Sequence, residues 1–250
     1  IEGEPVLLSW SGSMFEYLMP LIVMPGYDNS LLNQTCKAAV ERQIEYGKHK
    51  GVPWGISESG YNTVDVLRNY QYRAFGVPGL GLKRGLDEDL VIAPYASALA
   101  LLVMPEKACE NLERMADKGF MGNHGFYEAV DYTVSRVPRG QSMAIVKSFM
   151  AHHTGMEFLS FAYILLNRPM QKRFESEPLF QSALLLLQER ILNTSSIFTH
   201  TSGVPVTKST DENQQMPYRL FNTPDTQFPE VNLLSNGGGY QVMITNAGGG

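Results

Sequence analysis

Residues 51–81 bring together the side-chain types that bind and cleave sugars. One carboxylate, Glu58, lies between two serines, and aromatic, amide and hydroxyl side chains follow it closely. Flat rings cover the C–H face of a pyranose, amides and hydroxyls bind its hydroxyl groups, and a carboxylate supplies the chemistry. The stretch therefore predicts a polar cleft lined with rings. Its candidate contacts are Trp54, Tyr61, Asn62, Tyr70 and Tyr72.

A second polar and aromatic passage spans residues 119–141, and its candidate side chains are Tyr127, Glu128, Asp131 and Arg139. Cleavage of a glycosidic bond needs two carboxyl groups, about 5–5.5 Å apart for retention of configuration and about 6.5–9.5 Å apart for inversion. The residues alone make Glu58 one member of such a pair and leave Glu128 or Asp131 as the other. A plainer interpretation stays open, in which Glu128 and Asp131 are surface acids beside arginines.

Two further residues carry chemistry in an apolar setting. Glu16 lies inside the apolar run of residues 5–28, where it is either a buried carboxylate paired with an arginine or backbone donors, or a sugar-binding group. His152 and His153 are adjacent on an expected helix, so their side chains point about 100° apart and do not readily share a metal. We interpret His153 as a partly buried, hydrogen-bonded histidine near the cleft wall, where it can contact substrate, and not as a proton-transfer group.

Composition and charge limit the class of protein. With 250 residues, 44% hydrophobic and 18% charged, the chain has the make-up of a soluble globular domain. Its net charge of −5 gives no basic surface for nucleic acid or anionic lipid, which favours an uncharged substrate. Cys36 and Cys109 lack metal-ligand spacing, and the glycines between residues 76 and 85 match no nucleotide-binding motif. We expect no metal, no cofactor and a reduced, cytosolic setting.

The chain also lacks the signals of a membrane protein. No stretch reaches the roughly 18 apolar residues of a membrane span, and no basic and apolar leader opens the sequence. We therefore expect no direct membrane contact from this segment. The first residue is Ile1, and the last three are glycines after a strand-like run, which indicates a segment of a longer protein.

The elements that would hold the candidate side chains are mainly helices. Prolines, glycines and the spacing of apolar residues predict helices over residues 12–19, 30 to 47 or 51, 95–103, 105–119 and 142–166, with two more beginning at Pro169 and Pro178. The region 193–230 is polar without apolar periodicity, as in a linker. Residues 231–235 and 240–245 alternate like two strands around a glycine-rich turn. The pattern predicts a helical array, a linker and a hairpin.

Several long blocks, in one order, resemble the glycoamylase-like domain of the cyclic β-1,2-glucan synthases. The blocks are WSGSMFEYLMP, GVPWGISESGYN, NYQYRAFGVPGLGLKRGL, VIAPYASALAL, RGQS and FMAHH. They lie within residues 7–191, about three quarters of the chain. So many blocks in sequence make the resemblance specific.

The resemblance implies a fold and a domain division. Residues 1–192 would be the C-terminal part of an (α/α)6 toroid, whose preceding helices are not in this sequence. Residues 193–230 would be the linker, and residues 231–250 the start of the β-sandwich that precedes a phosphorylase-like module. Partners implied in this way are a β-1,2-glucan chain and the glycosyltransferase and phosphorylase-like modules of the same polypeptide. The implied location is the cytoplasmic side of the bacterial inner membrane, with this segment itself soluble.

The resemblance also implies retaining transglycosylation that closes linear β-1,2-glucan into a ring. Glu58 matches the nucleophile of that family, and the acid/base glutamate is expected in a Ser-Glu-Ala-Arg block upstream of residue 1. Substrate contacts are then expected from the rings and amides of both passages. Two alternatives stay open: an inverting endo-β-1,2-glucanase, and a glucan-binding or spacer domain without catalysis.

Overall fold

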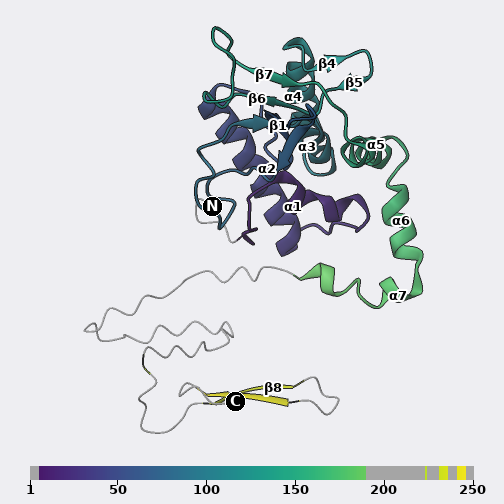
Figure 1. Cartoon of the computed structure of the whole chain (residues 1–250). Helices are drawn as coiled ribbons and strands as arrows, with labels where there is room; N and C mark the ends of the chain where they lie inside the picture. Colours follow the sequence, from purple (N-terminus) through teal and green to yellow (C-terminus); the bar gives the residue numbers. More distant parts are fainter. Residues whose placement is uncertain (1–5, 190–222, 224–230, 236–240, 246–250) are drawn as a thin grey trace, which may run out of the picture. The chain divides into compact units, whose positions relative to one another are not determined.

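The computed structural model describes residues 6–189, 223, 231–235 and 241–245. The chain divides into two compact units, Ile1–Ser195 and Ser196–Gly250. Helices dominate the first unit (Figure 1), so the expected mainly helical class is confirmed. Its helices are α1 (Met14–Leu18), η1 (Met19–Ile22), α2 (Leu31–Lys50), α3 (Pro94–Leu99), η2 (Ala100–Leu102), α4 (Pro105–Asp117), α5 (Ala151–Leu165), α6 (Pro169–Ser176), α7 (Pro178–Gln181) and η3 (Leu186–Gln188).

Helix α2 is capped at both ends by residues that the sequence points to. Ser30 Oγ accepts the N–H of Asn33 at 3.2 Å, and Gly51 takes the left-handed conformation with φ 72°. On its buried face, Gln43 Nε2 donates to Ile56 O at 2.7 Å, and Gln43 Oε1 accepts from Ile56 N at 2.8 Å. The segment that leads to Glu58 is thereby fastened to α2.

The helices α3 and α4 begin at prolines, where the missing N–H costs nothing. Every residue of α3 is buried. Asn111 of α4 donates from Nδ2 to Trp54 O and to Ser97 Oγ, both at 2.8 Å. One side-chain amide thus joins α4, α3 and the segment before β1, which fixes these three parts relative to one another in the core.

Short strands complete the first unit. They are β1 (Ser59–Val64), β2 (Tyr70–Arg73), β3 (Val91–Ile92), β4 (Met121–Gly122), β5 (Gly125–Phe126), β6 (Ala129–Asp131) and β7 (Ala144–Val146). Strands β1 and β2 form an antiparallel hairpin, β4 and β5 form another, and β3, β6 and β7 form an antiparallel sheet with β6 in the centre. The β1–β2 hairpin lies against β6 and β7 (Figure 1).

The helix predicted over residues 142–166 is wrong in its first part. Residues 144–146 form β7, and α5 begins only after Met150. Ile145 and Val146 are β-branched and suit a strand, and β6 supplies their pairing partner. Burial differs between the two parts, because His153 on α5 is 3% exposed whereas Phe149, between β7 and α5, is 47% exposed.

Helices α6 and α7 begin at the two prolines that predicted them. Gln171 of α6 donates from Nε2 to the carbonyl oxygens of Leu21 and Ile22, at 2.6 and 2.9 Å. Helix α6 is thereby tied to η1. From α5 onward, several large apolar side chains are exposed: Phe158, Phe161, Ile164, Leu165, Leu166, Leu179, Phe180, Leu185 and Leu186.

In the second unit the structure describes β8 (Val231–Ser235) and β9 (Gln241–Thr245), an antiparallel pair. The two predicted strands and their antiparallel pairing are confirmed, and the glycine-rich turn predicted between them lies outside the described residues. The predicted linker, residues 193–230, lies outside the described residues except for Thr223. Within the described ranges, no helix has both the length and the hydropathy to cross a bilayer.

The passage between residues 76 and 85 packs so closely on the segment before α1 that Gly76 has no room for a side chain. A Cβ there would stand 1.6 Å from Ser11 O, a backbone atom that cannot turn aside. We expect Gly76→Ala to lower the free energy of unfolding by about 3 kcal/mol or more, measured by urea unfolding.

Gly155 within α5 is the matched control for this substitution. A Cβ at that position meets nothing within 4 Å, and alanine is a better helix former than glycine by about 1 kcal/mol. Gly155→Ala should therefore keep or raise the stability. Equal stability of the Gly76→Ala variant and the unchanged chain would contradict the close packing.

Candidate active site

Glu58 lies just before β1, on a segment whose main chain is held by hydrogen bonds. Tyr95 Oη lies 2.8 Å from Glu58 O and 2.8 Å from Ser57 Oγ, and the N–H of Phe15 donates to Ser57 Oγ at 3.0 Å. Ser57 is fully buried, whereas the Glu58 side chain is partly exposed. A carboxylate with a fixed backbone and an accessible head suits nucleophilic or acid–base work.

A line of polar contacts runs from Glu58 to Glu128. Tyr72 Oη donates to Glu58 Oε2 at 3.1 Å and lies 3.3 Å from His153 Nε2. On the other side of the ring, His153 Nδ1 lies 3.0 Å from Glu128 Oε2, and Glu128 Oε1 accepts the N–H of Gly60 at 2.9 Å. We call Glu58, Tyr72, His153 and Glu128 the relay. It joins two carboxylates that the sequence separates by 70 positions (128 − 58).

The middle of the relay is enclosed by rings. Tyr95 stacks on His153 with centroids 3.7 Å apart and an interplanar angle of 11°, and Tyr72 covers His153 at 5.9 Å. Burial, followed by the charge and hydrogen bond of Glu58, raises the pKa of Tyr72 well above its ordinary value. The Tyr72 phenol therefore keeps its proton and acts as a hydrogen-bond donor throughout the pH range in which enzymes work.

Beside the relay lies a small groove of about 10 Å³. It is lined by Tyr95, Phe126, Tyr127, Glu128, Phe149, Met150, His153, Thr154 and Glu157. Burial, and then the charge of Glu128, raises the pKa of Glu157 to about 7. A carboxyl group that keeps its proton to near neutral pH can serve as an acid or a base.

A larger pocket of about 250 Å³ lies away from Glu58. Most of its walls are apolar side chains between residues 7 and 36, together with Leu187. Glu16 is the one carboxylate among the described residues of its wall, and hydrogen bonds already occupy it, so this described lining offers no acid–base pair. The smaller groove beside the relay is therefore the better candidate for chemistry.

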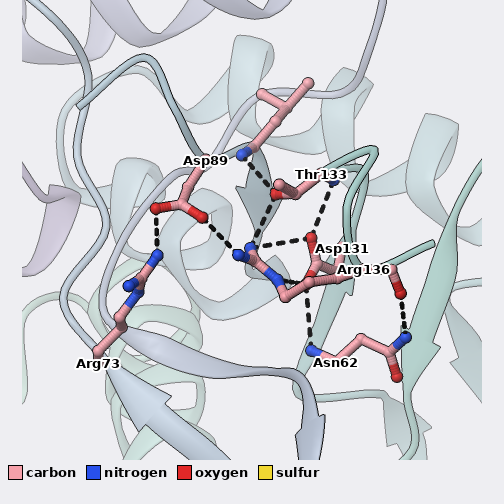
Figure 2. Close-up of polar contacts among 7 residues, drawn as sticks. Asn62, Arg73, Asp89, Asp131, Thr133 and Arg136 are labelled. Carbon is pink, nitrogen blue, oxygen red and sulfur yellow. Dashed lines mark hydrogen bonds and ion pairs between the residues drawn. The ribbon is translucent and has the colours of Figure 1, made fainter. Parts of the chain in front are cut away.

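Figure 2 shows a cluster of charges that fastens the β1–β2 hairpin to the sheet. Arg136 donates from Nε to Asp131 Oδ2 at 2.6 Å and from Nη1 to Asp89 Oδ1 at 2.5 Å, and Arg73 binds the other oxygen of Asp89. Asp131 Oδ2 also accepts the N–H of Asn62 at 3.1 Å. Burial opposes the charge of Arg136, but the hydrogen bonds and charges of Asp131 and Asp89 outweigh it and raise the pKa of Arg136.

The reading of Glu128 and Asp131 as surface acids is wrong, since they are 5% and 0% exposed. Glu128 belongs to the relay. Asp131 is held by Arg136, by Asn62 and by the N–H of Thr133 at 2.9 Å, so its carboxylate is committed to the fold. The structure brings Glu128 to the site and places Asp131 in the cluster that supports it.

Several of the expected sugar contacts pack inside the domain. Trp54 is 6% exposed and belongs to the core. Tyr61 has Arg73 and Arg136 over its ring, at 5.2 and 5.0 Å, and Tyr70 packs against the core. Asn62 uses its side-chain amide on Arg136 O at 2.6 Å. Tyr72, Tyr127, Glu128 and His153 lie at the relay or its groove.

Glu16 is the other acid left open by the sequence. It forms a capping box with Ser13 at the start of α1 and accepts the hydroxyl of Ser11 at 2.6 Å. Burial raises the pKa of Glu16, but hydrogen bonds from Ser11, Ser9 and Ser13 lower it by more, so the pKa lies below its ordinary value. These contacts tie the Glu16 carboxylate to the start of α1. Arg139 lies exposed in the loop before β7.

Three site residues were missed by the sequence reasoning: Tyr95, Asp89 and Glu157. Tyr95 follows Pro94 at the start of a buried helix, and that position signals packing but not a hydrogen bond to residues 37 or 38 positions away. Asp89 meets Arg136 only through tertiary contact. Glu157 carries a signal that could have been read, because it follows His153 by one helical turn on α5.

Among the described residues, no three His, Cys, Asp or Glu side chains group in a way that could hold a metal ion. A model of the glycoamylase family, described as "Putative glucoamylase", matches residues 1–178. The chain belongs to the glycoamylase family. The match covers both Glu58 and the relay that it forms with Glu128.

Individual proteins of known sequence or structure resemble this glycoamylase-family chain. The cyclic β-(1,2)-glucan synthase NdvB of Rhizobium meliloti (strain 1021) is 43% identical over 251 residues, which cover 100% of this chain and 9% of that protein. The chain thus spans less than a tenth of that relative. A solved protein of Bacteroides caccae, described as a putative glucoamylase, gives a TM-score of 0.48 at 20% identity over 71% of this chain and 41% of that one. An endo-β-1,2-glucanase from Chitinophaga pinensis gives 0.46 at 19% identity over 72% and 41%.

The charged cluster predicts a stability effect at Arg136. Arg136→Met leaves the buried carboxylate of Asp131 without its cation, so the free energy of unfolding should fall by about 3 kcal/mol. Asp131→Asn in the same chain removes that charge and should recover part of the loss. Urea unfolding of the single and double variants measures the coupling. As control, Arg139→Met on the exposed loop should change stability by less than about 0.5 kcal/mol.

The raised pKa of Glu157 predicts a dependence of stability on pH. Between its ordinary value of 4.5 and about 7, the folded protein binds more protons than the unfolded chain, so stability falls as pH rises through that interval. Glu157→Gln should remove this part of the fall, measured by urea unfolding at several pH values. Glu113→Gln on an exposed position of α4 is the control and should keep it. An unchanged slope in Glu157→Gln would contradict the assignment.

Proposed function

We propose that this chain carries the nucleophile of a retaining transglycosylase that acts on β-1,2-glucan, and that Glu58 is the nucleophile. The supporting observation is the state of Glu58, whose main chain is anchored by Tyr95 and whose Oε2 is held by Tyr72 while the side chain stays accessible. The substrate class is suggested by the 43% identical relative, which is named as a cyclic β-(1,2)-glucan synthase.

The reaction would proceed in two displacements at the anomeric carbon. In the first, Glu58 Oε1 bonds to C1 of a glucosyl unit as the C1–O bond of the linkage breaks, and the leaving oxygen takes a proton from an acid. We place that acid in residues that precede Ile1. In the second, the deprotonated acid removes the proton of a 2-hydroxyl group, whose oxygen bonds to C1 as the Glu58 carboxylate leaves. When the 2-hydroxyl belongs to the same glucan chain, the product is a ring.

The surface beside the relay would contact a glucosyl unit bound at Glu58, since the groove itself has room for only about one water molecule. Tyr127 and Phe149 meet there with ring centroids 5.7 Å apart, and Tyr72 is 40% exposed. Rings of this kind cover the C–H face of a pyranose and exclude water, which favours attack by a sugar hydroxyl over hydrolysis. Glu128 and His153 would contribute hydrogen bonds from the groove wall, and Arg139 would contact the glucan from its loop.

We further propose that residues 6–189 are the C-terminal part of an (α/α)6 toroid within a larger polypeptide. The support is the exposed apolar surface of α5 and α7, where Phe158 is 69%, Leu165 is 76% and Leu179 is 78% exposed. Apolar surface of this kind is normally covered by neighbouring elements. Preceding helices of the toroid would cover it, and glycosyltransferase and phosphorylase-like modules of the same polypeptide would supply and process the glucan.

A hydrolytic reaction is the second candidate, and Glu157 favours it. A carboxyl group with a pKa near 7, in a groove of about 10 Å³, has the reactivity and the space to activate one water molecule. An inverting endo-β-1,2-glucanase would use such a water and would leave a linear product of inverted configuration.

The test uses the full-length protein and 2,4-dinitrophenyl β-sophoroside. Dinitrophenolate leaves without a proton, so the first displacement depends on the nucleophile and not on the upstream acid. We expect a burst of one dinitrophenolate per active site and a sophorosyl ester on the peptide that contains Glu58, identified by mass spectrometry. Glu58→Gln should abolish both.

Asp65→Asn, on the exposed turn between β1 and β2, is the matched control and should keep the burst. Product analysis on linear β-1,2-glucan then separates the candidates. Cyclic products, or linear ones of retained configuration, support the proposal, whereas inverted linear products from a protein that forms no ester support hydrolysis. Glucan binding without any product would leave a binding module.

A further inference from the structure

If Glu58 is the nucleophile, as proposed above, the positions of the protons in the relay decide how its carboxylate is held. The Tyr72 phenol has one hydrogen but two neighbours that can accept it, Glu58 Oε2 at 3.1 Å and His153 Nε2 at 3.3 Å. If the hydrogen points to Glu58, then Nε2 must carry its own hydrogen and donate it to Tyr72. The direction of this one hydrogen bond decides whether Glu58 is held.

The other side of the His153 ring needs a proton as well. Nδ1 lies 3.0 Å from Glu128 Oε2, and two acceptors cannot share that distance without a hydrogen between them. A neutral imidazole has only one N–H, so it cannot serve both Tyr72 and Glu128. The complete relay therefore requires one proton more than a neutral His153 and an ionised Glu128 contain. Whether that proton resides on His153 or on Glu128 does not change the count.

Loss of that proton would reverse the hydrogen bond. The remaining ring N–H would stay at Nδ1, where Glu128 is its acceptor, and Nε2 would become an acceptor. Tyr72 would then turn its hydrogen toward His153, and Glu58 would lose its partner. Burial and the nearby carboxylates raise the pKa of Tyr72, so the phenol itself does not ionise in the same range.

The groups around His153 come from three elements and from two segments between elements. They are His152 and Glu157 on α5, Tyr72 from β2, Tyr95 from α3, and the carboxylates of Glu58 and Glu128 from the segments before β1 and β6. Among them, His152 is a second imidazole, and burial and then the charge of His153 lower the pKa of His152.

We propose that His153 and Glu128 are positioning residues that share one proton, and that this proton keeps the Tyr72 hydroxyl directed at the nucleophile Glu58. The relay thus couples the proton shared by His153 and Glu128 to the orientation of the Glu58 carboxylate, with Tyr72 between them. It gives the first displacement an alkaline limb that depends on His153, although His153 does not touch the reacting carbon.

The substrate-free test follows the hydrogen bond itself in the full-length protein. With 3-fluorotyrosine incorporated at position 72, ¹⁹F NMR should show a one-proton step in chemical shift as pH rises. His153→Gln, which has no ionising group, should remove the step, and Glu128→Gln should move its midpoint. His152→Gln is the matched control and should keep the step. A step that persists in His153→Gln, or no step in the unchanged chain, would overturn the proposal.

The kinetic test asks whether the same proton acts on Glu58. The rate of the dinitrophenolate burst should fall on the alkaline side with the midpoint of the ¹⁹F step, and His153→Gln should lose this limb. Tyr72→Phe should also lose the limb and slow the burst about tenfold or more, because a hydrogen bond to a charged group is removed. An alkaline limb retained in Tyr72→Phe would refute the relay. A ¹⁹F step without any burst would refute the nucleophile assignment and leave the proton sharing intact.

Discussion

The buried ion pair between Asp131 and Arg136 is the interaction on which the candidate site depends. Asp131 is fully buried, and its two oxygens hold Arg136, the β1 backbone at Asn62 and the chain after β6. Such a carboxylate is tolerated only because its charge and lone pairs are satisfied. The same contacts hold the β1–β2 hairpin, which carries Tyr72, against the sheet whose strand β6 begins directly after Glu128. The buried charges therefore position the site residues as well as contributing to stability.

The rest of the site is built from few additional contacts. Gln43 holds the segment that ends in Glu58, and Gly60 passes so close to Glu128 that a Cβ at Gly60 would stand 3.2 Å from its Cγ. That closeness lets the N–H of Gly60 reach a carboxylate oxygen. A relay of side chains from distant parts of the sequence is therefore held by backbone positions and not by the side chains alone.

Local chemistry made much of the helical fold predictable. Ser30 and Gly51 mark the ends of α2, and prolines mark the starts of α3, α4, α6 and α7. These signals can be recognised in the sequence because a capping hydrogen bond, or the missing N–H of a proline, involves only residues within one helical turn. Strand β7 was misread as helix because residues 144–146 become a strand only through β6, a partner about fifteen positions earlier. Without that partner, the β-branched Ile145 and Val146 favour a strand only weakly.

In the candidate site, too, features with a local signal were predictable and features that depend on distant contacts were not. Glu58 and Glu128 stand out by residue type in polar, aromatic stretches, and the structure joins them. Trp54 and Tyr61 are also aromatic residues in such a stretch, yet Trp54 lies in the core and Tyr61 packs, partly buried, against it, since an aromatic ring serves a core as well as a sugar. The contribution of Tyr95 could not be read from its neighbours, because its hydroxyl acts on Ser57 and Glu58 and its ring acts on His153.

That double use of Tyr95 has a mechanical consequence. One rigid phenol group touches the backbone of Glu58 with its oxygen and the imidazole of His153 with its face. When thermal motion displaces α3, Tyr95 moves both contacts in the same direction. The displacements of Glu58 and His153 are then correlated, and the distance between them changes less than either position does. A shared strut of this kind preserves the spacing between two groups even where neither is held rigidly to the remainder of the molecule.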